Sequence, residues 1–338
     1  MTDAALALLP DRVQAAVRRR WPGAHVGELE PLPGGVSSLT FSAGISGRAP
    51  VVVKVAPPGL APVRNRDVLR QARVMAAVHG APGVRVPAVL AEDDGAPPFF
   101  VMEFVAGDAY EPKWDVSPVP PAPAVVAARA RAAARMLARL QAVDPAAAGL
   151  GDEPVLSPGD ELERWARLYA TAGDELRGDE RSLADALAAR VPDPAPGPAR
   201  ILHGDYRLGN MQFAGDTLAA IIDWEIWSLG DPRHDLAWLM AFADPVQQRA
   251  RERDAANQAA ADAMPSAATL LAEYLDEAGV AEAPPDLDWF VALAYYKLGA
   301  TMSVLAKRNR RAAEPDPGLE LVAATTPPML ERARGLVT

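Results

Sequence analysis

HGDYRLGNMQFAGDTLAAIIDWE, residues 203–225, is the most informative stretch of this sequence. It places charged and amide side chains between two apolar runs, residues 201–202 and 219–222, which are typical of buried strands. Burying such polar groups costs a few kcal/mol each unless they are paired. The stretch therefore predicts either a functional site or a structural polar network around a hairpin.

Three side chains in this stretch have the chemistry of a magnesium site. Asp205 and Asn210 are five positions apart in a loop that contains Gly209, and Asp223 follows Asp205 by 18 residues, a spacing suited to a returning hairpin. Mg²⁺ prefers oxygen ligands, takes few of them from the protein and shares the rest with phosphates. The spacing predicts that these three side chains face one point.

Two features nearer the N-terminus favour phosphate binding. PGGVSS, residues 33–38, stands between two strand-like runs, and its paired glycines would let backbone amides approach a phosphate. An ordinary hairpin turn would have the same sequence. Lys54 lies within the apolar run VVVKV, in a chain with only four lysines among 34 basic residues. Its ammonium suits a nucleotide phosphate, and the alternative is an edge-strand lysine that reaches water.

The pattern along the chain predicts a small β-rich lobe followed by a larger helical lobe. Strand-like runs are followed, beyond Gly107, by a composition rich in helix formers, so we expect an α+β protein with a boundary near that glycine. The expected helices cover residues 3–20, 66–78, 124–142 and 158–190, and the expected strands lie near 39–41, 51–55, 99–105 and 218–223.

Composition limits the class of protein. Half of the residues are apolar, and the net charge of −10 argues against nucleic acid or an anionic membrane as a partner. The absence of cysteine excludes disulfides and thiolate chemistry. No run reaches the ~18 uncharged apolar residues of a membrane span, and the N-terminus has no secretory pattern. We expect a cytoplasmic protein, and its oligomeric state stays open.

In chain order these features resemble the aminoglycoside phosphotransferase family of the protein-kinase-like superfamily. The resemblance covers about residues 25–300 and rests on the glycine loop, Lys54, MEFV at 102–105, HGDYRLGN, IIDWE and GDPRHDLAWL at 230–239. It implies a bilobal kinase-like fold. Residues 1–105 would form a nucleotide-binding lobe with a leading helix, an antiparallel sheet and one further helix. Residues 106–338 would form a helical lobe with the catalytic loop, the metal site and the acceptor pocket.

The resemblance implies transfer of the γ-phosphoryl group of ATP to a hydroxyl of a small molecule, with Mg²⁺ as the metal. Asp205 would act as the catalytic base or orient the acceptor hydroxyl, and Arg207 would steady the transferring phosphoryl group. Asn210 and Asp223 would hold Mg²⁺.

The remaining roles that the resemblance implies concern ATP and the support of the catalytic loop. The residues expected to bind ATP are Gly34, Gly35, Ser37, Ser38 and Lys54 at the phosphates and Glu103, Phe104 and Val105, through their backbone, at the adenine. The residues expected to support the site are Gln71, His203, Asp231 and Asp235.

Gln71 is a departure from the family pattern, which pairs the strand lysine with a glutamate on the following helix. An amide can orient Lys54 by a hydrogen bond but gives no charge pairing. A catalytically weak nucleotide-binding pseudokinase is therefore an alternative. Because the metal-binding and catalytic residues are all present, we favour an active enzyme.

The acceptor stays open at the level of sequence. We expect it between Asp205 and the segments 158–180 and 285–310, and the candidate walls are Trp165, Tyr169, Tyr295, Tyr296 and Lys297. A polycationic aminoglycoside would suit the acidic residues Asp160, Glu161, Glu163, Asp174 and Glu175. The segment around DWE also resembles modules associated with hydroxyacyl-CoA breakdown, for which the basic residues would be Arg164, Arg167, Arg308, Arg310 and Arg311. Choline, sugars and macrolides are further alternatives.

Overall fold

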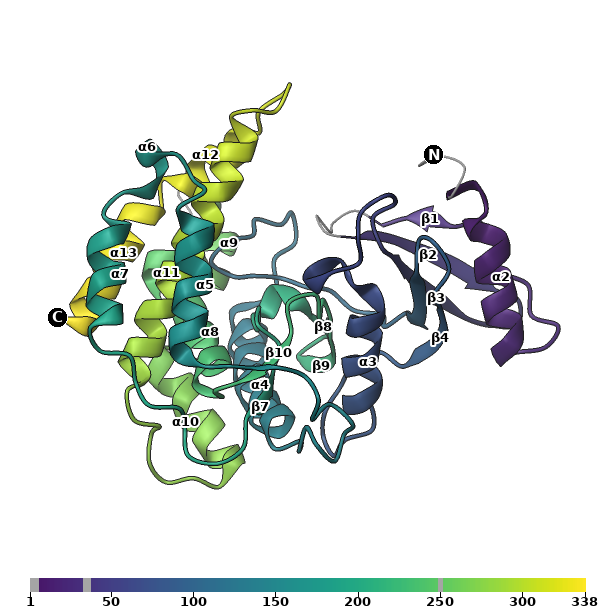
Figure 1. Ribbon diagram of the computed structural model, residues 1–338, viewed down its shortest axis with the longest axis horizontal. Coiled ribbons are helices and arrows are strands. Elements are labelled where there is room, and N and C mark those ends of the chain that lie inside the picture. Colours follow the sequence, from purple (N-terminus) through teal and green to yellow (C-terminus); the bar gives the residue numbers. More distant parts are fainter. Residues whose placement is uncertain (1–5, 33–37, 249–251) are drawn as a thin grey trace.

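The computed structural model describes residues 6–32, 38–248 and 252–338. The chain forms two lobes (Figure 1): an N-terminal lobe built on an antiparallel sheet, and a larger C-terminal lobe that is mainly helical. The expected α+β fold is confirmed. Gly34, Gly35 and Ser37, which we expected to contact phosphate, lie outside the described residues.

The N-terminal sheet has the strand order β1-β2-β3-β5-β4, and every neighbouring pair is antiparallel. β3 is central, and its residues from Val51 to Val55 are all buried, which explains the unbroken apolar run around Lys54. β1 and β4 are short or irregular strands that period-two alternation did not predict. The strands are β1 (Glu30–Pro31), β2 (Leu39–Ile45), β3 (Arg48–Val55), β4 (Val89–Asp93) and β5 (Phe99–Glu103).

Two helices, α2 (Leu9–Arg20) and α3 (Val68–Val78), pack against this sheet. Val53 and Val55 belong to the same apolar cluster as the buried face of α2. Because successive side chains of a strand alternate between faces, Lys54 points to the opposite face of the sheet. The buried residues of α3 belong to the larger cluster that continues into the C-terminal lobe. α3 is therefore packed between the sheet and the second lobe.

The chain crosses between the lobes by passing against strand β8 (Met211–Ala214). Asp108 and Phe213 exchange two backbone hydrogen bonds, each 3.0 Å long. A Cβ atom at Gly107 would lie 2.7 Å from the carbonyl oxygen of Phe213. The approach of two backbones, rather than an unusual dihedral angle, is what requires glycine at this crossing.

The C-terminal lobe is organised around α11, whose inward residues pack against α5, α8 and α13. By length and composition α11 is the one helix among the described residues that could span a membrane, but most of it is buried against its neighbours. Besides α2 and α3, the described residues form η1 (Arg64–Arg66), α4 (Pro123–Gln141), α5 (Pro158–Tyr169), α6 (Asp174–Arg177), α7 (Glu180–Ala188), η2 (Leu208–Asn210), α8 (Arg233–Ala243), η3 (Pro245–Gln247), α9 (Ala255–Asp262), α10 (Ala267–Ala278), α11 (Leu287–Asn309), α12 (Pro317–Ala323) and α13 (Thr326–Val337).

Two small sheets hold the polar stretch of residues 203–225. β8 pairs with β9 (Thr217–Ile221) in the expected hairpin. A second sheet has the order β6-β10-β7, with β6 (Val155–Leu156) parallel to β10 (Ser228–Gly230) and β7 (Arg200–Leu202) antiparallel to it. The catalytic-loop stretch therefore leaves β7 and returns through the hairpin to β10, which confines its polar residues to one place.

The crossing at Gly107 gives a test of the lobe junction. We expect Gly107→Ala to lower the free energy of unfolding by about 2 kcal/mol, because the new methyl group must push two hydrogen-bonded backbones apart. Urea denaturation followed by tryptophan fluorescence measures the change. Gly44→Ala, in β2 of the N-terminal lobe, is the control because a Cβ atom there would meet nothing within 4 Å. Equal stability of the two variants would contradict the tight crossing.

Candidate active site

His203 and Asp235 hold the start of the loop 203–210, which is the expected catalytic loop. The carboxylate of Asp235, on α8, accepts hydrogen bonds from the backbone N–H groups of His203 (2.6 Å) and Gly204 (2.9 Å). Burial raises the pKa of Asp235, against the effect of these donors. The imidazole of His203 accepts from the Asp205 N–H at Nδ1 (3.3 Å), which leaves Nε2 to donate to the carbonyl of Ile222 (2.8 Å). Both ring nitrogens are engaged, so His203 supports the loop.

Asp205 is the best-held carboxylate of the site. Its Oδ1 accepts from Trp238 Nε1 (2.9 Å), and its Oδ2 accepts from the amide nitrogen of Asn210 (2.7 Å). Arg207 Nε lies 3.2 and 3.3 Å from the two oxygens. Burial would raise the pKa of Asp205, but the charge of Arg207 and these donors outweigh it and lower the pKa. Asp205 is therefore ionised at neutral pH and better suited to orient a hydroxyl than to act as a strong base.

Asn210 and Asp223 are brought together by the backbone between them. Ile222 N–H donates to the carbonyl of Asn210 (2.9 Å), which places Asp223 beside the end of the catalytic loop. Asp223 has φ of 64°, an uncommon value for a residue other than glycine, found where the surroundings hold the backbone in place. The amide nitrogen of Asn210 donates twice to Asp205, so its oxygen is left to accept. This pair of oxygen ligands fits Mg²⁺, which needs few from the protein.

Lys54 connects the two lobes at this point. Its ammonium donates to Asp223 Oδ1 at 2.8 Å, from β3 of the N-terminal lobe to the end of the hairpin. Gln71 does not share this interaction: it is buried on α3, and its amide donates to the carbonyl of Asn65 (3.2 Å). The structure therefore does not show a hydrogen bond from the Lys54 ammonium to the Gln71 amide.

The N-terminal lobe supplies further groups near Lys54. Ser38 is buried, and its hydroxyl has no hydrogen-bond partner among the described residues. Glu103, at the end of β5, donates its backbone N–H to Ala88 (2.9 Å), and Phe104 and Val105 begin the segment that crosses to the second lobe. Ser38 thus has an unused donor for a ligand, whereas the backbone N–H of Glu103 is already used within the N-terminal lobe.

Asp231 has a different environment from Asp235. Its carboxylate accepts from Arg233 (2.6 and 2.9 Å) and from the backbone of Ala195 (2.7 Å). Burial would raise its pKa, but these donors lower it. Asp231 therefore fixes the connector around residues 193–195, because its carboxylate bonds to Ala195 and Arg233 rather than to the loop 203–210.

Glu111 is a buried carboxylate that sequence reasoning missed. Its Oε2 accepts from the Gly209 N–H (3.1 Å) and lies 3.8 Å from Arg207. The guanidinium of Arg207 also stacks near the Trp114 and Phe242 rings. Burial raises the pKa of Glu111 to about 7, despite the positive charge of Arg207. Nothing in its local sequence distinguishes Glu111 from a surface acid, because its partners lie about a hundred residues away.

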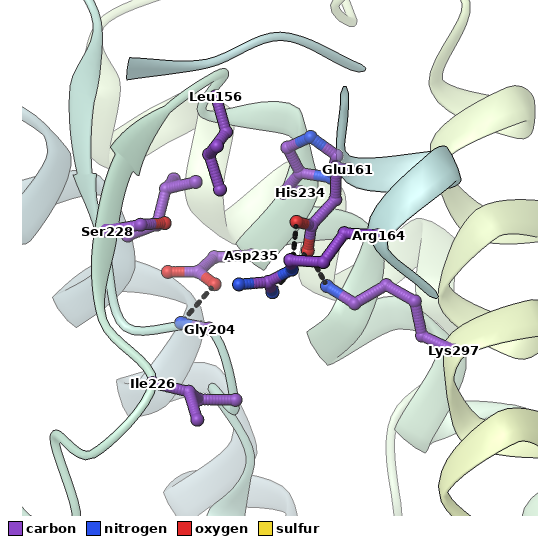
Figure 2. Close-up of a pocket in the computed structure, with 10 residues that line it drawn as sticks. Leu156, Glu161, Arg164, Gly204, Ile226, Ser228, His234, Asp235 and Lys297 are labelled. Carbon is purple, nitrogen blue, oxygen red and sulfur yellow. Dashed lines mark hydrogen bonds and ion pairs between the residues drawn. The ribbon is translucent and has the colours of Figure 1, made fainter. Parts of the chain in front are cut away.

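A small polar cavity lies behind the catalytic loop (Figure 2). The ammonium of Lys297 is 2.9 Å from Glu161, which also pairs with Arg164. Lys297 lies over the rings of Trp165 and Trp238 as well. Burial would raise the pKa of Glu161, but Lys297 and Arg164 lower it to about 2. The cavity has a volume of about 10 Å³, room for one water molecule. Because Lys297 lies against the Trp238 ring and Trp238 donates to Asp205, this ion-paired group supports Asp205 from behind.

A wider groove of about 690 Å³ shares a wall with this cavity. Trp165 lines it, as expected, whereas Tyr169, Tyr295 and Tyr296 are fully buried in the helical core and line neither hollow. Residues that line the groove are Asn65, Arg70, Glu153, Pro154, Leu156, Arg164, Trp165, Arg167, Leu168, Glu225, Ile226, Trp227 and Ser228. The groove therefore combines apolar and aromatic side chains with three arginines and two glutamates.

Together, the small antiparallel lobe, the helical lobe and the catalytic loop between them define a kinase-like phosphotransferase fold. A model of the phosphotransferase enzyme family matches residues 28–270, and the chain belongs to this family. A solved protein from Ralstonia eutropha JMP134, which bears the provisional name aminoglycoside phosphotransferase, superposes with a TM-score of 0.74 at 24% identity over 97% of both chains. At that identity the likeness shows the fold alone.

The curated relatives are longer proteins. Acyl-CoA dehydrogenase family member 10 of Mus musculus is 26% identical over 299 residues, which cover 83% of this chain and 26% of that protein. Acyl-CoA dehydrogenase family member 11 of Rattus norvegicus is 25% identical over 289 residues, which cover 83% of this chain and 36% of that protein. The chain thus spans about a third or less of these relatives.

Glu111 gives a test of the site by pH. Since burial raises its pKa from 4.5 to about 7, the folded protein binds a proton more tightly than the unfolded chain, and stability falls as pH rises through that window. Glu111→Gln removes the titration. Its unfolding free energy relative to wild type should increase by about 2.5 kcal/mol from about pH 5 to about pH 8. Urea denaturation at both pH values measures this, and a constant difference would contradict the buried ionisation.

Proposed function

We propose that this protein is a Mg²⁺-ATP-dependent kinase that phosphorylates a hydroxyl of a small molecule. The observation that carries the proposal is the meeting of Lys54 with Asp223 at 2.8 Å, beside a catalytic loop in which Asn210 holds Asp205. A cation from one lobe and oxygen ligands from the other are the groups that phosphoryl transfer requires.

Several groups support nucleotide binding between the lobes. Lys54 would contact the α- and β-phosphates, and the unpartnered hydroxyl of Ser38 would donate to a phosphate oxygen. The backbone of Phe104 and Val105 would meet the adenine, with Glu103 at the edge of that segment. Gly34, Gly35 and Ser37 would complete the phosphate loop. One similar solved structure, a mutant aminoglycoside phosphotransferase with a TM-score of 0.61, is a ternary complex with ADP and hygromycin B.

Asn210 and Asp223 would hold Mg²⁺, which when bound neutralises phosphate charge. The acceptor hydroxyl would hydrogen-bond to Asp205, so that its oxygen faces the γ-phosphorus in line with the leaving ADP. The new oxygen–phosphorus bond forms as the bond to ADP breaks, and the hydroxyl proton passes to Asp205. Arg207, fixed by Glu111 and by its aromatic neighbours, would steady the transferring group.

The groove beside the catalytic loop is the candidate acceptor site, and the acidic residues that would suit a polycationic acceptor do not line it. Glu161, Glu163 and Asp174 each form an ion pair with a neighbouring lysine or arginine. Asp160 caps the first turn of α5 by hydrogen-bonding to Ser157. These carboxylates are already paired or used, so they do not form the acidic cluster that an aminoglycoside would need.

A hydroxyacyl-CoA is the second candidate acceptor, favoured by the groove's composition. Arg164 and Arg167 could meet its phosphates, and Trp165, Leu168 and Trp227 offer apolar surface for an acyl chain. Arg310, by contrast, pairs with Glu320 outside the groove. The names of the curated relatives refer to acyl-CoA dehydrogenases, which is compatible with such an acceptor.

An assay of ADP release with Mg²⁺ across hydroxylated acceptors tests the proposal. The panel holds aminoglycosides, macrolides, choline, sugars and hydroxyacyl-CoAs. We expect acceptor-dependent turnover that Asp205→Asn lowers by at least about a hundredfold, because the amide cannot take the proton. Asp216→Asn, an exposed carboxylate at the turn of the β8–β9 hairpin, is the matched control. Mg²⁺-ATP binding without turnover on any acceptor would favour the pseudokinase, and failure to bind nucleotide would refute the proposal.

The groove gives a separate prediction about the acceptor's charge. Arg167 is largely exposed and pairs only loosely with Glu163, at 3.3 Å. If the acceptor is anionic, Arg167→Glu should raise its KM by roughly tenfold with little change in kcat, through charge repulsion. Arg181→Glu, on α7 and outside the groove, is the control with the same charge change. An unchanged KM in Arg167→Glu would remove this groove, or an anionic acceptor, from the proposal.

A further inference from the structure

Helix α3 is not attached to Lys54, although it follows the lysine strand in the chain. Lys54 pairs with Asp223, and the neighbouring amide of Gln71 is used by the carbonyl of Asn65. Some other contact must fix the N-terminal turn of α3 relative to the catalytic loop. The apolar face of the helix restricts sliding only weakly, since such packing is not directional.

Arg70, one position before Gln71, makes that contact with Trp227 of the C-terminal lobe. Its guanidinium donates to the Trp227 carbonyl (3.0 Å), and the Trp227 indole donates back to the Arg70 carbonyl (3.1 Å). The guanidinium also lies 4.0 Å from the centre of the indole ring. Two reciprocal hydrogen bonds and a stacked pair therefore join the same two residues across the lobes. We call this pair the Arg70–Trp227 clamp.

Glu153 supports the clamp from a third segment. Its Oε2 accepts from Arg70 Nε (3.1 Å) and from a terminal nitrogen of the same guanidinium (3.0 Å). Its Oε1 accepts from Arg73 (3.1 Å), which also donates to the carbonyl of Gly149 (2.9 Å). Glu153 is mostly buried. Because the arginine is paired and most of its donors are used, its orientation is fixed rather than one of many rotamers.

Trp227 in turn belongs to the short loop that begins at Asp223. That loop starts with the left-handed backbone of Asp223 and continues through Trp224. The Trp224 indole donates to the Ile221 carbonyl (3.2 Å) and packs edge-on against His203. Both tryptophans are almost fully buried. The loop is therefore held along its length, so we expect a shift of Trp227 to change the position of Asp223.

We propose that Arg70 is the positioning residue of the nucleotide site. Through the Arg70–Trp227 clamp it holds α3 and the loop after Asp223 as one unit, and so sets where Asp223 stands relative to Lys54. Arg70 takes over the anchoring of this helix that a lysine–glutamate pair would otherwise supply. The inference rests on the proposed function, since it takes the site between Lys54 and Asp223 to bind a nucleotide.

The clamp also forms one end of the candidate acceptor groove, which Arg70, Glu153 and Trp227 line. An acceptor in the groove would therefore touch the same residues that position the nucleotide site. Lysine cannot replace Arg70 fully, because an ammonium lacks the planar fork that reaches Glu153 and the Trp227 carbonyl together while stacking on the ring.

The test uses the full chain and the variants Arg70→Gln, Arg70→Lys and Trp227→Phe. Trp227→Phe keeps an aromatic ring but loses the donor to the Arg70 carbonyl. The matched control is Arg48→Gln, which removes an arginine that stacks on Trp21 at 4.5 Å within the N-terminal lobe. Two quantities are measured while all variants are folded: hydrogen exchange over residues 68–78 and 223–227, and the affinity for AMP-PNP with Mg²⁺.

We expect Arg70→Gln and Trp227→Phe to speed exchange in both segments and to weaken AMP-PNP binding by about tenfold. Arg70→Lys should fall between these variants and wild type, and Arg48→Gln should match wild type. A loss of stability alone would not produce this pattern, since the affinity is measured on folded protein and the lysine variant rescues part of it.

Unchanged exchange and unchanged AMP-PNP affinity in both Arg70→Gln and Trp227→Phe would overturn the positioning role and leave the proposed function standing. Faster exchange with unchanged affinity would also overturn it, because the clamp would then be structural only. If wild type bound no AMP-PNP, the proposed function would fail, and the nucleotide role of Arg70 with it.

Discussion

The two hydrogen bonds that the Asp235 carboxylate accepts, from the backbone N–H groups of His203 and Gly204, are the interaction on which the site depends. They fix a tight turn in which Gly204 has φ of 86° and a Cβ atom would lie 2.7 Å from the Ile226 carbonyl. From this turn His203 reaches the carbonyl of Ile222 and so ties the loop to the end of the hairpin, next to Asp223. The buried Asp235 thus orders the loop that begins at His203 and, through His203, the end of the hairpin. These two segments set the positions of Asp205, Asn210 and Asp223.

Around this centre, most polar groups are positioned by partners that have no part in the chemistry. Asp205 is held by Trp238, which has the Lys297 ammonium against its ring, and Lys297 in turn pairs with Glu161. Arg207 lies between Asp205 and Glu111. Such networks of paired side chains restrict the rotamers of each member, and pairing lowers the free-energy cost of burying the charges. The site is consequently rigid on the C-terminal side, and the N-terminal lobe approaches it through Lys54 and the Arg70–Trp227 clamp.

The sequence predicted the fold class, and it drew attention to the residues nearest to the proposed chemistry because most of them are close together in the chain. Asp205 and Asn210 precede the β8–β9 hairpin and Asp223 follows it, so their convergence follows from local spacing. Lys54 stands out because it interrupts an apolar strand. Short or irregular strands such as β1 and β10 gave no pattern, since two or three residues cannot show alternation. The resemblance suggested that Gln71 orients Lys54, but that pairing is not made. The amide nitrogen of Gln71 donates to the Asn65 carbonyl, and the Lys54 ammonium donates to Asp223 instead. The roles of the individual site residues remain predictions that the proposed experiments address.

By itself, the sequence determined which segments could be buried and which side chains are available for the proposed contacts with a metal and a phosphate. Only the tertiary structure decided which charges meet. Glu111 and Arg207, Glu153 and Arg70, and Glu161 and Lys297 are each separated by 80 residues or more. No local pattern records such pairs, because an acid that will be buried against a distant cation looks in sequence like any solvated acid. The folded chain brings them together. It also pairs Glu161, Glu163 and Asp174, which look in sequence like part of an acidic cluster, with neighbouring cations.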